Sequence, residues 1–324
     1  MTYEKFVDYV KERIEELLGD DNIVRIHKVL KNNDVELDAL TVLNKASNVS
    51  PTIYLNQYYE DYMKGFELDY IIQEIYNLYE EHSKKLNFNI NVFKDYSKIC
   101  NRIAFKLINT KSNEKLLNDI PSVPFMDLSI VFYCLLDDDY LGSATALIHN
   151  VHMDMWNVSV KELYKRAKEN TPLLLGCELK NMNDMIKEML ICDLQETIYE
   201  KDDRYDRNCN MPGPEIVAEG LMKDIVDDEN AITMYVLTNR PRTNGAVCMI
   251  YDNVIKNFAK EMKKDLFILP SSVHEVILVP IVDGISREEL TKMVKEVNTK
   301  ELDEIDVLSD HVYYYCLKSE KLTM

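Results

Sequence analysis

The chain has 324 residues, of which 46% are hydrophobic and 29% are charged, and it carries a formal net charge of −18. This composition argues against an intrinsically disordered chain, and the length allows one large or two to three ordinary domains with proper cores. The 56 acidic residues outnumber the 38 basic ones. That balance argues against direct nucleic-acid binding, which needs clustered Lys and Arg to replace the counterions of the phosphate backbone.

The pattern of apolar residues also argues against a membrane or secreted protein. No apolar run reaches the roughly 18–20 residues that span a bilayer, and the first residues begin an amphipathic helix instead of a signal peptide. The 7 cysteines are scattered without a Cys-x-x-Cys pair, and several lie in apolar runs such as 132–135. We therefore expect a cytoplasmic protein whose cysteines are reduced thiols of the core.

Helices and strands can be predicted along most of the chain. Phe6, Val10 and Ile14 recur at helical spacing and predict a helix over 3–18. Strand patterns over 23–30 and 35–43 flank Lys31-Asn32-Asn33-Asp34, where Asn and Asp tolerate the left-handed backbone of a tight turn. The other predicted elements are helix 67–85, strand 104–108, short helix 113–118, helix 181–200, a loop or linker over 201–214, helix 215–227, strands 265–269 and 276–280, a helix from the Ser286-Arg287-Glu288-Glu289 capping box to about 297, and strand 311–317.

One local pattern occurs three times: an apolar run, a polar connection, a second apolar run and an amphipathic helix. The copies are 39–43, 52–55 and 57–64; 128–136, 144–148 and 158–168; and 232–237, 246–250 and 253–263. Such units bury one hairpin face under a helix and commonly stack to share a core. We therefore expect an α+β fold of repeated β-hairpin/helix units with antiparallel sheets covered by helices. The expected divisions are residues 1–120, 121–205 and 206–324, each with one unit.

The segment Pro270–Glu275 has the most motif-like composition. Ser271, Ser272, His274 and Glu275 supply a nucleophile, a base and an acid within five positions. Working triads, however, are assembled from distant segments, and no Gly-x-Ser-x-Gly elbow is present to expose a nucleophile. We interpret the segment as an architectural turn in which a serine caps one helical turn and Glu275 returns a hydrogen bond. The alternative is a binding or catalytic turn formed by the same four residues.

Three other groups of polar residues have the types for a site, and each has a plainer interpretation. His149 and His152 near Asp154 have zinc-ligand types, but their spacing is common and in a strand would point them to opposite faces. The acidic run 137–139 has the types for a magnesium or calcium site but is more typical of a solvated turn. Arg240, Arg242 and Asn244 have the types for binding an anionic partner but are more typical of loop residues. The 8 glycines form no nucleotide-cradling string. We therefore predict no metal site and no cofactor.

Four passages resemble the domain-of-unknown-function family 5688 of gut clostridia. They are Lys31-Asn32-Asn33 with 36–41, then 51–56, 124–128 and 269–280. The Pro-Ser-Ser-x-His-Glu string in the last passage is the most specific element, and the resemblance spans nearly the whole chain. It implies an intracellular bacterial protein and supplies no catalytic residue.

The sequence favours a non-enzymatic protein-interaction or regulatory module. Some of the 20 tyrosines would then supply contact area to a protein partner. The alternatives are a small hydrolase using Ser271 or Ser272 with His274 and Glu275, and an acidic inhibitor that mimics nucleic acid. A pocket around His274, one acidic face or an exposed tyrosine-rich patch would distinguish these three hypotheses. The oligomeric state and the identity of a partner do not follow from the sequence.

Overall fold

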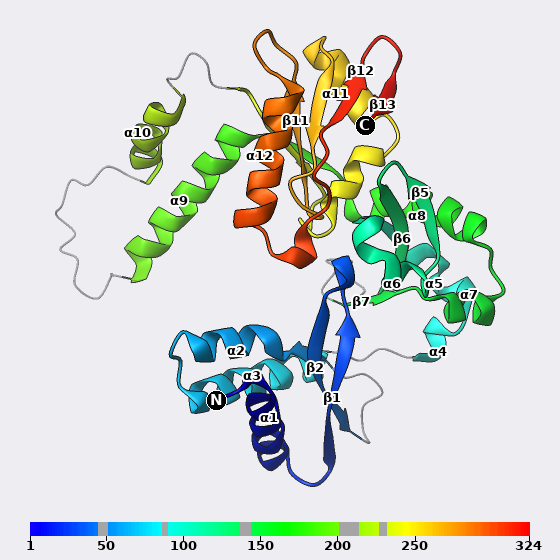
Figure 1. Ribbon diagram of the computed structural model, residues 1–324, viewed down its shortest axis with the longest axis vertical. Coiled ribbons are helices and arrows are strands. Elements are labelled where there is room, and N and C mark those ends of the chain that lie inside the picture. Colours follow the sequence, from blue (N-terminus) through cyan, green and yellow to red (C-terminus); the bar gives the residue numbers. More distant parts are fainter. Residues whose placement is uncertain (45–50, 86–89, 137–143, 201–213, 227–231) are drawn as a thin grey trace.

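The protein has an α+β fold with three antiparallel sheets, as the sequence predicts. The computed structural model describes residues 1–44, 51–85, 90–136, 144–200, 214–226 and 232–324. Figure 1 shows the first sheet with its helices at one end of the molecule and the other two sheets beside each other at the opposite end. Within the described ranges, no helix is both long enough and apolar enough to cross a bilayer.

The N-terminal part packs three helices against a three-stranded sheet. Its elements are α1 (Tyr3–Leu18), β1 (Asn22–Leu30), β2 (Glu36–Asn44), β3 (Thr52–Tyr54), α2 (Leu55–Met63) and α3 (Leu68–Lys85), and the strand order is β1-β2-β3. Phe6, Val10 and Ile14 of α1 are fully buried in the core of this part, so the helical spacing seen in the sequence marks the packed face.

The predicted hairpin between the first two strands is confirmed. β1 pairs antiparallel with β2, from Asn22 opposite Asn44 to Leu30 opposite Glu36. A short 3-10 helix, η1 (Asn32–Asp34), forms the turn, and Asn33 and Asp34 have φ values of 59° and 54°. Asn and Asp are the residues other than glycine that most readily occupy this left-handed region, which explains the turn locally.

The middle part is a second antiparallel sheet. β6 (Leu128–Leu135) is buried along its whole length and pairs with all three other strands of this sheet. Those strands are β4 (Ile103–Asn109), β5 (Ser122–Phe125) and β7 (Thr145–Leu147). The surrounding helices are α4 (Ile90–Phe93), α5 (Tyr96–Ile99), η2 (Cys100–Arg102), η3 (Lys111–Asn113), α6 (Glu114–Leu117), α7 (Asn150–Trp156) and α8 (Val160–Leu175).

The C-terminal part holds a six-stranded sheet in the order β13-β12-β10-β11-β9-β8. Its strands are β8 (Glu178–Asn181), β9 (Tyr235–Thr238), β10 (Leu266–Leu269), β11 (Val276–Pro280), β12 (Tyr313–Cys316) and β13 (Lys321–Thr323). Its helices are α9 (Met182–Glu200), α10 (Pro214–Val226), η4 (Gly245–Ile250), α11 (Val254–Met262), α12 (Arg287–Lys300) and η5 (Glu304–Asp306). The predicted capping box is confirmed, because the Ser286 hydroxyl accepts from the Glu289 amide at 3.1 Å and the Glu289 carboxylate accepts from the Ser286 amide at 3.4 Å.

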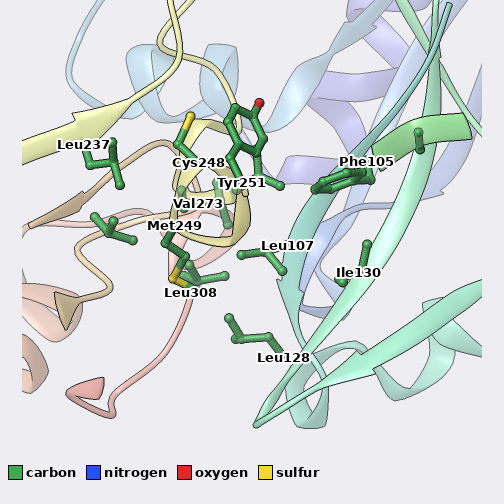
Figure 2. Close-up of a cluster of buried hydrophobic side chains, with 14 of the residues drawn as sticks. Phe105, Leu107, Leu128, Ile130, Leu237, Cys248, Met249, Tyr251, Val273 and Leu308 are labelled. Carbon is green, nitrogen blue, oxygen red and sulfur yellow. The ribbon is translucent and has the colours of Figure 1, made fainter. Parts of the chain in front are cut away.

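The middle and C-terminal sheets share one hydrophobic core. Figure 2 shows Phe105, Leu107 and Ile130 of the middle sheet facing Met249 and Leu308 of the C-terminal part. Strand pairs also cross the divisions expected from the sequence: β4 pairs with β6 across residue 120, and β8 pairs with β9 across residue 205. The division into 1–120, 121–205 and 206–324 stays a prediction about independent folding.

The two apolar runs of the predicted unit pair as antiparallel strands in two of the three copies, and the repeat itself stays a prediction. β2 pairs with β3 in the first copy, and β6 pairs with β7 in the second, where α7 precedes the expected helix. In the third copy the prediction of a second strand over 246–250 is wrong, because this run forms the 3-10 helix η4. Residues 246–249 are buried on all sides, and a short apolar run without alternation does not distinguish a strand from a buried helical segment. The connection over 137–142 and the loop over 201–213 lie outside the described residues.

Candidate functional site

The turn Pro270–Glu275 is held together by its own serine and glutamate. The Ser272 hydroxyl, which is 2% exposed, accepts a hydrogen bond from the His274 amide at 3.0 Å and donates one to the Glu275 carboxylate at 3.2 Å. The Ser271 amide donates to the carbonyl of Leu269 at 3.0 Å. Ser272 therefore closes the turn as a local capping residue does.

The His274 ring has a hydrogen bond at each nitrogen. Nδ1 lies 3.2 Å from the amide nitrogen of Asn244, and Nε2 lies 3.2 Å from the carboxylate of Asp306. A backbone amide can only donate, so Nδ1 accepts and the proton of the neutral ring is on Nε2, where it faces Asp306. The hydrogen bond to Asp306, opposed in part by burial, raises the pKa of His274.

Among the described residues, no hydrogen bond joins either serine hydroxyl to the His274 ring. The four predicted residues do lie together, but Ser272 contacts the His274 backbone and the ring contacts Asn244 and Asp306. A nucleophile needs its base within hydrogen-bond reach of the hydroxyl, and both ring nitrogens already have other partners. The arrangement is that of a packed turn which holds the His274 imidazole against Asn244 and Asp306.

A close approach of η4 fixes the position of this turn. A Cβ atom on Gly245 would lie 2.2 Å from the Thr238 hydroxyl and 2.4 Å from the His274 carbonyl oxygen. The Thr238 hydroxyl donates to that same carbonyl at 2.7 Å, and the Ala246 amide donates to the Val273 carbonyl. Only glycine fits at position 245, because the backbone of the turn occupies the place of a side chain.

The tip of the N-terminal hairpin docks onto the segment that holds Asp306. Asn32 donates to the Ile305 carbonyl at 2.6 Å, and Asn33 donates to the carbonyls of Glu304 and Val307 at 2.6 and 2.8 Å. The Asp34 carboxylate accepts from the amides of Lys115 and Leu116 at the start of α6. The hairpin thus joins all three parts of the molecule at one place (Figure 1).

Asp127 holds the chain that follows η5 against the middle sheet. Its carboxylate accepts from the hydroxyls of Ser309 at 2.6 Å and Tyr313 at 2.7 Å, and lies 3.0 Å from His311 Nδ1. Burial alone would raise the pKa of Asp127, but these three side-chain hydrogen bonds outweigh it and lower the pKa. Tyr313 is fully buried, so its hydroxyl depends on this carboxylate for a partner.

A cavity of about 550 Å³ lies where the hairpin, the middle sheet and the turn meet. Its charged lining consists of Lys28, Lys31, Lys106, Lys115, Asp119 and Asp306, with His149 and His274 beside them. Lysines therefore outnumber carboxylates in the wall of this cavity, although the chain as a whole has a net charge of −18. The volume is in the range of pockets that hold small metabolites.

The four cavity lysines have different surroundings. Lys28 and Lys115 are exposed and lie 3.6 and 3.7 Å from the two oxygens of the Glu36 carboxylate. Lys31 donates to the Tyr54 hydroxyl at 2.8 Å, with its ammonium 4.3 Å from the ring centroid. Lys106 makes no hydrogen bond or ion pair with any residue that the structure describes. Burial, with a further contribution from the charge of Lys31, lowers the pKa of Lys106 to about 8.

The position of Lys106 follows from the alternation of β4. Phe105 and Leu107 are in the core shared with the C-terminal sheet, so Lys106 points to the opposite face of the strand. Ile108 on that face and Val131, the register partner of Lys106, line the cavity with it. Lys106 is not among the candidate residues predicted from the sequence. A single lysine inside the apolar strand Ile103–Asn109 is the pattern that would have indicated it.

The other predicted candidates are dispersed. His149 and His152 are at the start of a helix, not in a strand, and cap α7: the His149 amide donates to His152 Nδ1, while the His149 ring lies 2.6 Å from Asp119. In the described part of the chain, no group of three or more His, Cys, Asp or Glu residues is placed to hold a metal. Asn244 lines the cavity whereas Arg240 and Arg242 do not, and the acidic run 137–139 lies outside the described residues.

The four passages that carry the family resemblance meet around this junction. They supply Lys31 and Asn32 of the hairpin tip, Tyr54 of β3, Asp127 before β6, and His274. A family model described as "Family of unknown function (DUF5688)" matches residues 3–317 of the chain. No curated protein and no solved structure matches the chain.

Proposed function

Because the chain belongs to the family of unknown function DUF5688, whose description assigns no activity, we propose from the geometry that it is a non-enzymatic regulatory module which binds a small anion. The binding site is the cavity between the hairpin tip, β4 and the turn Pro270–Glu275. The observation that carries this proposal is Lys106, a half-buried ammonium that interacts electrostatically with the cation Lys31 and with the His274 ring.

Electrostatics favour an anionic ligand at this place. The charge of Lys31 lowers the proton affinity of Lys106 in a partly desolvated space, and a negative charge that enters would offset this repulsion. Phosphate and carboxylate groups supply that charge together with several hydrogen-bond acceptors. The side-chain amide oxygen of Asn32 is a buried acceptor without a partner among the described residues, so a ligand that also carries a hydroxyl or amine would satisfy it.

A regulatory role is supported by where the cavity walls come from. Lys31 and Asn32 belong to the N-terminal hairpin, Lys106 to the middle sheet, and His274 to the C-terminal part. A ligand that contacts all three parts of the molecule stabilises the arrangement in which the hairpin is docked. The size of this effect is the difference between the free energies with which the ligand binds the docked and the released arrangements. Binding in the cavity would thus control how firmly the N-terminal part is held.

Inorganic phosphate tests this proposal directly. We expect phosphate to raise the melting temperature of the protein in a concentration-dependent manner, with an affinity that Lys106→Met lowers at least about tenfold, since one charge-assisted contact contributes about 1.5–3 kcal/mol. Lys295→Met on the exposed side of α12 is the matched control. Phosphate stabilises most proteins in a general way, and this effect cancels when the rise in melting temperature is compared between variants. Equal phosphate responses of the wild type, Lys106→Met and Lys295→Met would contradict the proposal.

The geometry gives little support to the hydrolase hypothesis. Ser272 is buried and holds the backbone of its own turn, and the His274 ring is bonded to Asn244 and Asp306. An acidic nucleic-acid mimic would need one extended acidic face and stays a prediction. The proposed location is the cytoplasm, which the free thiols of the six described cysteines support.

Protein binding is a second candidate, favoured by an exposed apolar patch between α2 and α3. Met63, Phe66 and Tyr70 are 65%, 50% and 55% exposed, and the rings of Phe66 and Tyr70 stack at 6.0 Å. The simplest occupant is a second copy of the chain. We expect sedimentation velocity to show association at rising protein concentration, and Phe66→Ser to abolish it. A wild type that stays monomeric throughout the series would rule out this occupant.

A further inference from the structure

We propose that Lys106 forms a reversible imine with a carbonyl group of the ligand, so that the cavity selects small anionic aldehydes and ketones such as oxo acids. This inference rests on the proposed anion site and adds the reactive group of the ligand. It is carried by the surroundings of the amine: a cavity that admits a metabolite, an apolar wall, a neighbouring cation, and no ion pair with a carboxylate among the described residues.

The apolar wall keeps the lysine poorly solvated. Lys106 extends from β4 beside Ile108 and Val131, and Leu30 of the hairpin and Leu116 of α6 line the same cavity. A charged ammonium loses hydration in such a place, and no described carboxylate forms an ion pair with it to compensate for the lost water. The neutral amine is therefore favoured relative to a lysine in water, and the neutral amine is the nucleophile.

The neighbouring cation works in the same direction. The charge of Lys31 adds to burial in lowering the pKa of Lys106 to about 8 from the ordinary 10.5. At pH 7 about one tenth of such an amine is neutral, against well under one thousandth of an ordinary lysine. Desolvation and an adjacent cation are the two means by which proteins prepare a lysine for imine formation.

Lys31 also supplies the contact that would orient the ligand. Its ammonium is positioned by the Tyr54 hydroxyl at 2.8 Å and lies in the cavity wall. An anionic group bound there leaves the other end of a small ligand next to Lys106. By comparison, Lys28 and Lys115 are exposed and share Glu36, so they lack the desolvation of Lys106 and are each paired with a carboxylate.

The reaction needs no further reagent. The nitrogen lone pair of Lys106 attacks the carbonyl carbon, and proton transfer from nitrogen to oxygen gives a carbinolamine. The remaining N–H proton passes to the hydroxyl oxygen, the C–O bond breaks, the oxygen leaves as water, and a C=N bond joins lysine and ligand. Addition of water reverses every step, so the protein releases the carbonyl compound unchanged, as a binding module should.

Glyoxylate with sodium cyanoborohydride tests the inference on the wild-type protein, because hydride reduction of an imine leaves a stable secondary amine on the lysine. We expect peptide mass spectrometry at pH 7 to find at least tenfold more modification on Lys106 than on Lys28 or Lys115, which serve as internal controls in the same cavity. Added phosphate should slow the labelling of Lys106 and leave that of Lys295 unchanged.

Lys106→Arg distinguishes the two proposals, because arginine keeps the positive charge but forms no imine under these conditions. We expect this variant to retain phosphate-dependent stabilisation and to lose the cavity adduct. If phosphate stabilises the wild type but Lys106 is modified no faster than Lys28 and Lys115, the imine is refuted and the anion site stands. If Lys106 is modified preferentially but phosphate neither stabilises nor competes, the anion site is refuted, and with it the proposed ligand class.

Discussion

Gly245→Ala is expected to destabilise the protein by about 2–4 kcal/mol, near the upper end of the range for an overpacked core. The added methyl group would lie 2.2 Å from the Thr238 hydroxyl and 2.4 Å from the His274 carbonyl, so either η4 or the turn must move. Both atoms belong to one hydrogen bond, and its loss leaves a buried acceptor. Chemical denaturation of the variant and the wild type measures the difference.

Gly220→Ala is the matched control for this change. Gly220 is in α10, where an added Cβ meets nothing within 4 Å, and alanine is the better helix former by about 1 kcal/mol. The same chemical substitution should therefore leave stability unchanged or raise it slightly. If Gly245→Ala behaves like Gly220→Ala, the packing of η4 against the turn is not as close as the structure shows, and the cavity wall next to His274 is not rigid.

Asp127→Ala is expected to cost about 1–3 kcal/mol, as leaving a buried hydrogen-bond donor without its acceptor does. Three side chains lose their acceptor at once, and the Tyr313 hydroxyl is left in a fully buried position. Asp283→Ala, at an exposed aspartate in the loop before α12, should change stability by no more than about 0.5 kcal/mol. Thermal and chemical denaturation of both variants provide the comparison.

Because of the Asp127 carboxylate, we also expect the stability of the protein to depend on pH. The pKa of Asp127 is lower in the folded protein than in the unfolded chain, so the unfolded state takes up protons first. The contribution of Asp127 is therefore complete above the ordinary value of 3.8 and is lost as pH falls through the lower folded value. Below pH 4 the difference in stability between the wild type and Asp127→Ala should shrink. A difference that stays constant down to pH 2 would show that the charge of Asp127 is unimportant.

The elements predicted correctly from sequence are those whose causes are local. Asn33 and Asp34 form the hairpin turn because their own backbone preferences allow φ values of 59° and 54°. Ser286 and Glu289 form a capping box because they are three residues apart on one turn of helix. Such signals lie within a few residues, so the structure that they predict does not depend on contacts with the rest of the chain.

The error at 246–250 has a tertiary cause. Gly-Ala-Val-Cys-Met-Ile has the composition of a strand, but Gly245 allows the chain to press against the His274 carbonyl, and the run continues as a 3-10 helix in the shared core. Neither contact is visible in the sequence of the segment itself. Packing with distant residues overrides the weak local preference of a short apolar run.

The cavity could not be predicted for a related reason. The residues singled out in the sequence are four neighbours, Ser271, Ser272, His274 and Glu275, and only His274 lines the cavity. Lys31, Lys106 and Asp306 join it from the turn after β1, from β4 and from η5, separated by more than 70 residues at each step. Pockets form where elements meet in space, so their composition depends on topology that a motif search does not use.

The docking of the hairpin tip has a consequence for which substitutions the junction tolerates. Asn32 and Asn33 donate to the main-chain carbonyls of Glu304, Ile305 and Val307, and Asp34 accepts from main-chain amides. In these bonds the side chains of the hairpin contact only the main chain of the opposing segments, whereas the Asn113 amide group is the one opposing side chain that bonds Asn33 among the described residues. The side chain at position 304 can change from acid to base without touching these bonds, whereas each hairpin residue contributes groups that no other residue type reproduces.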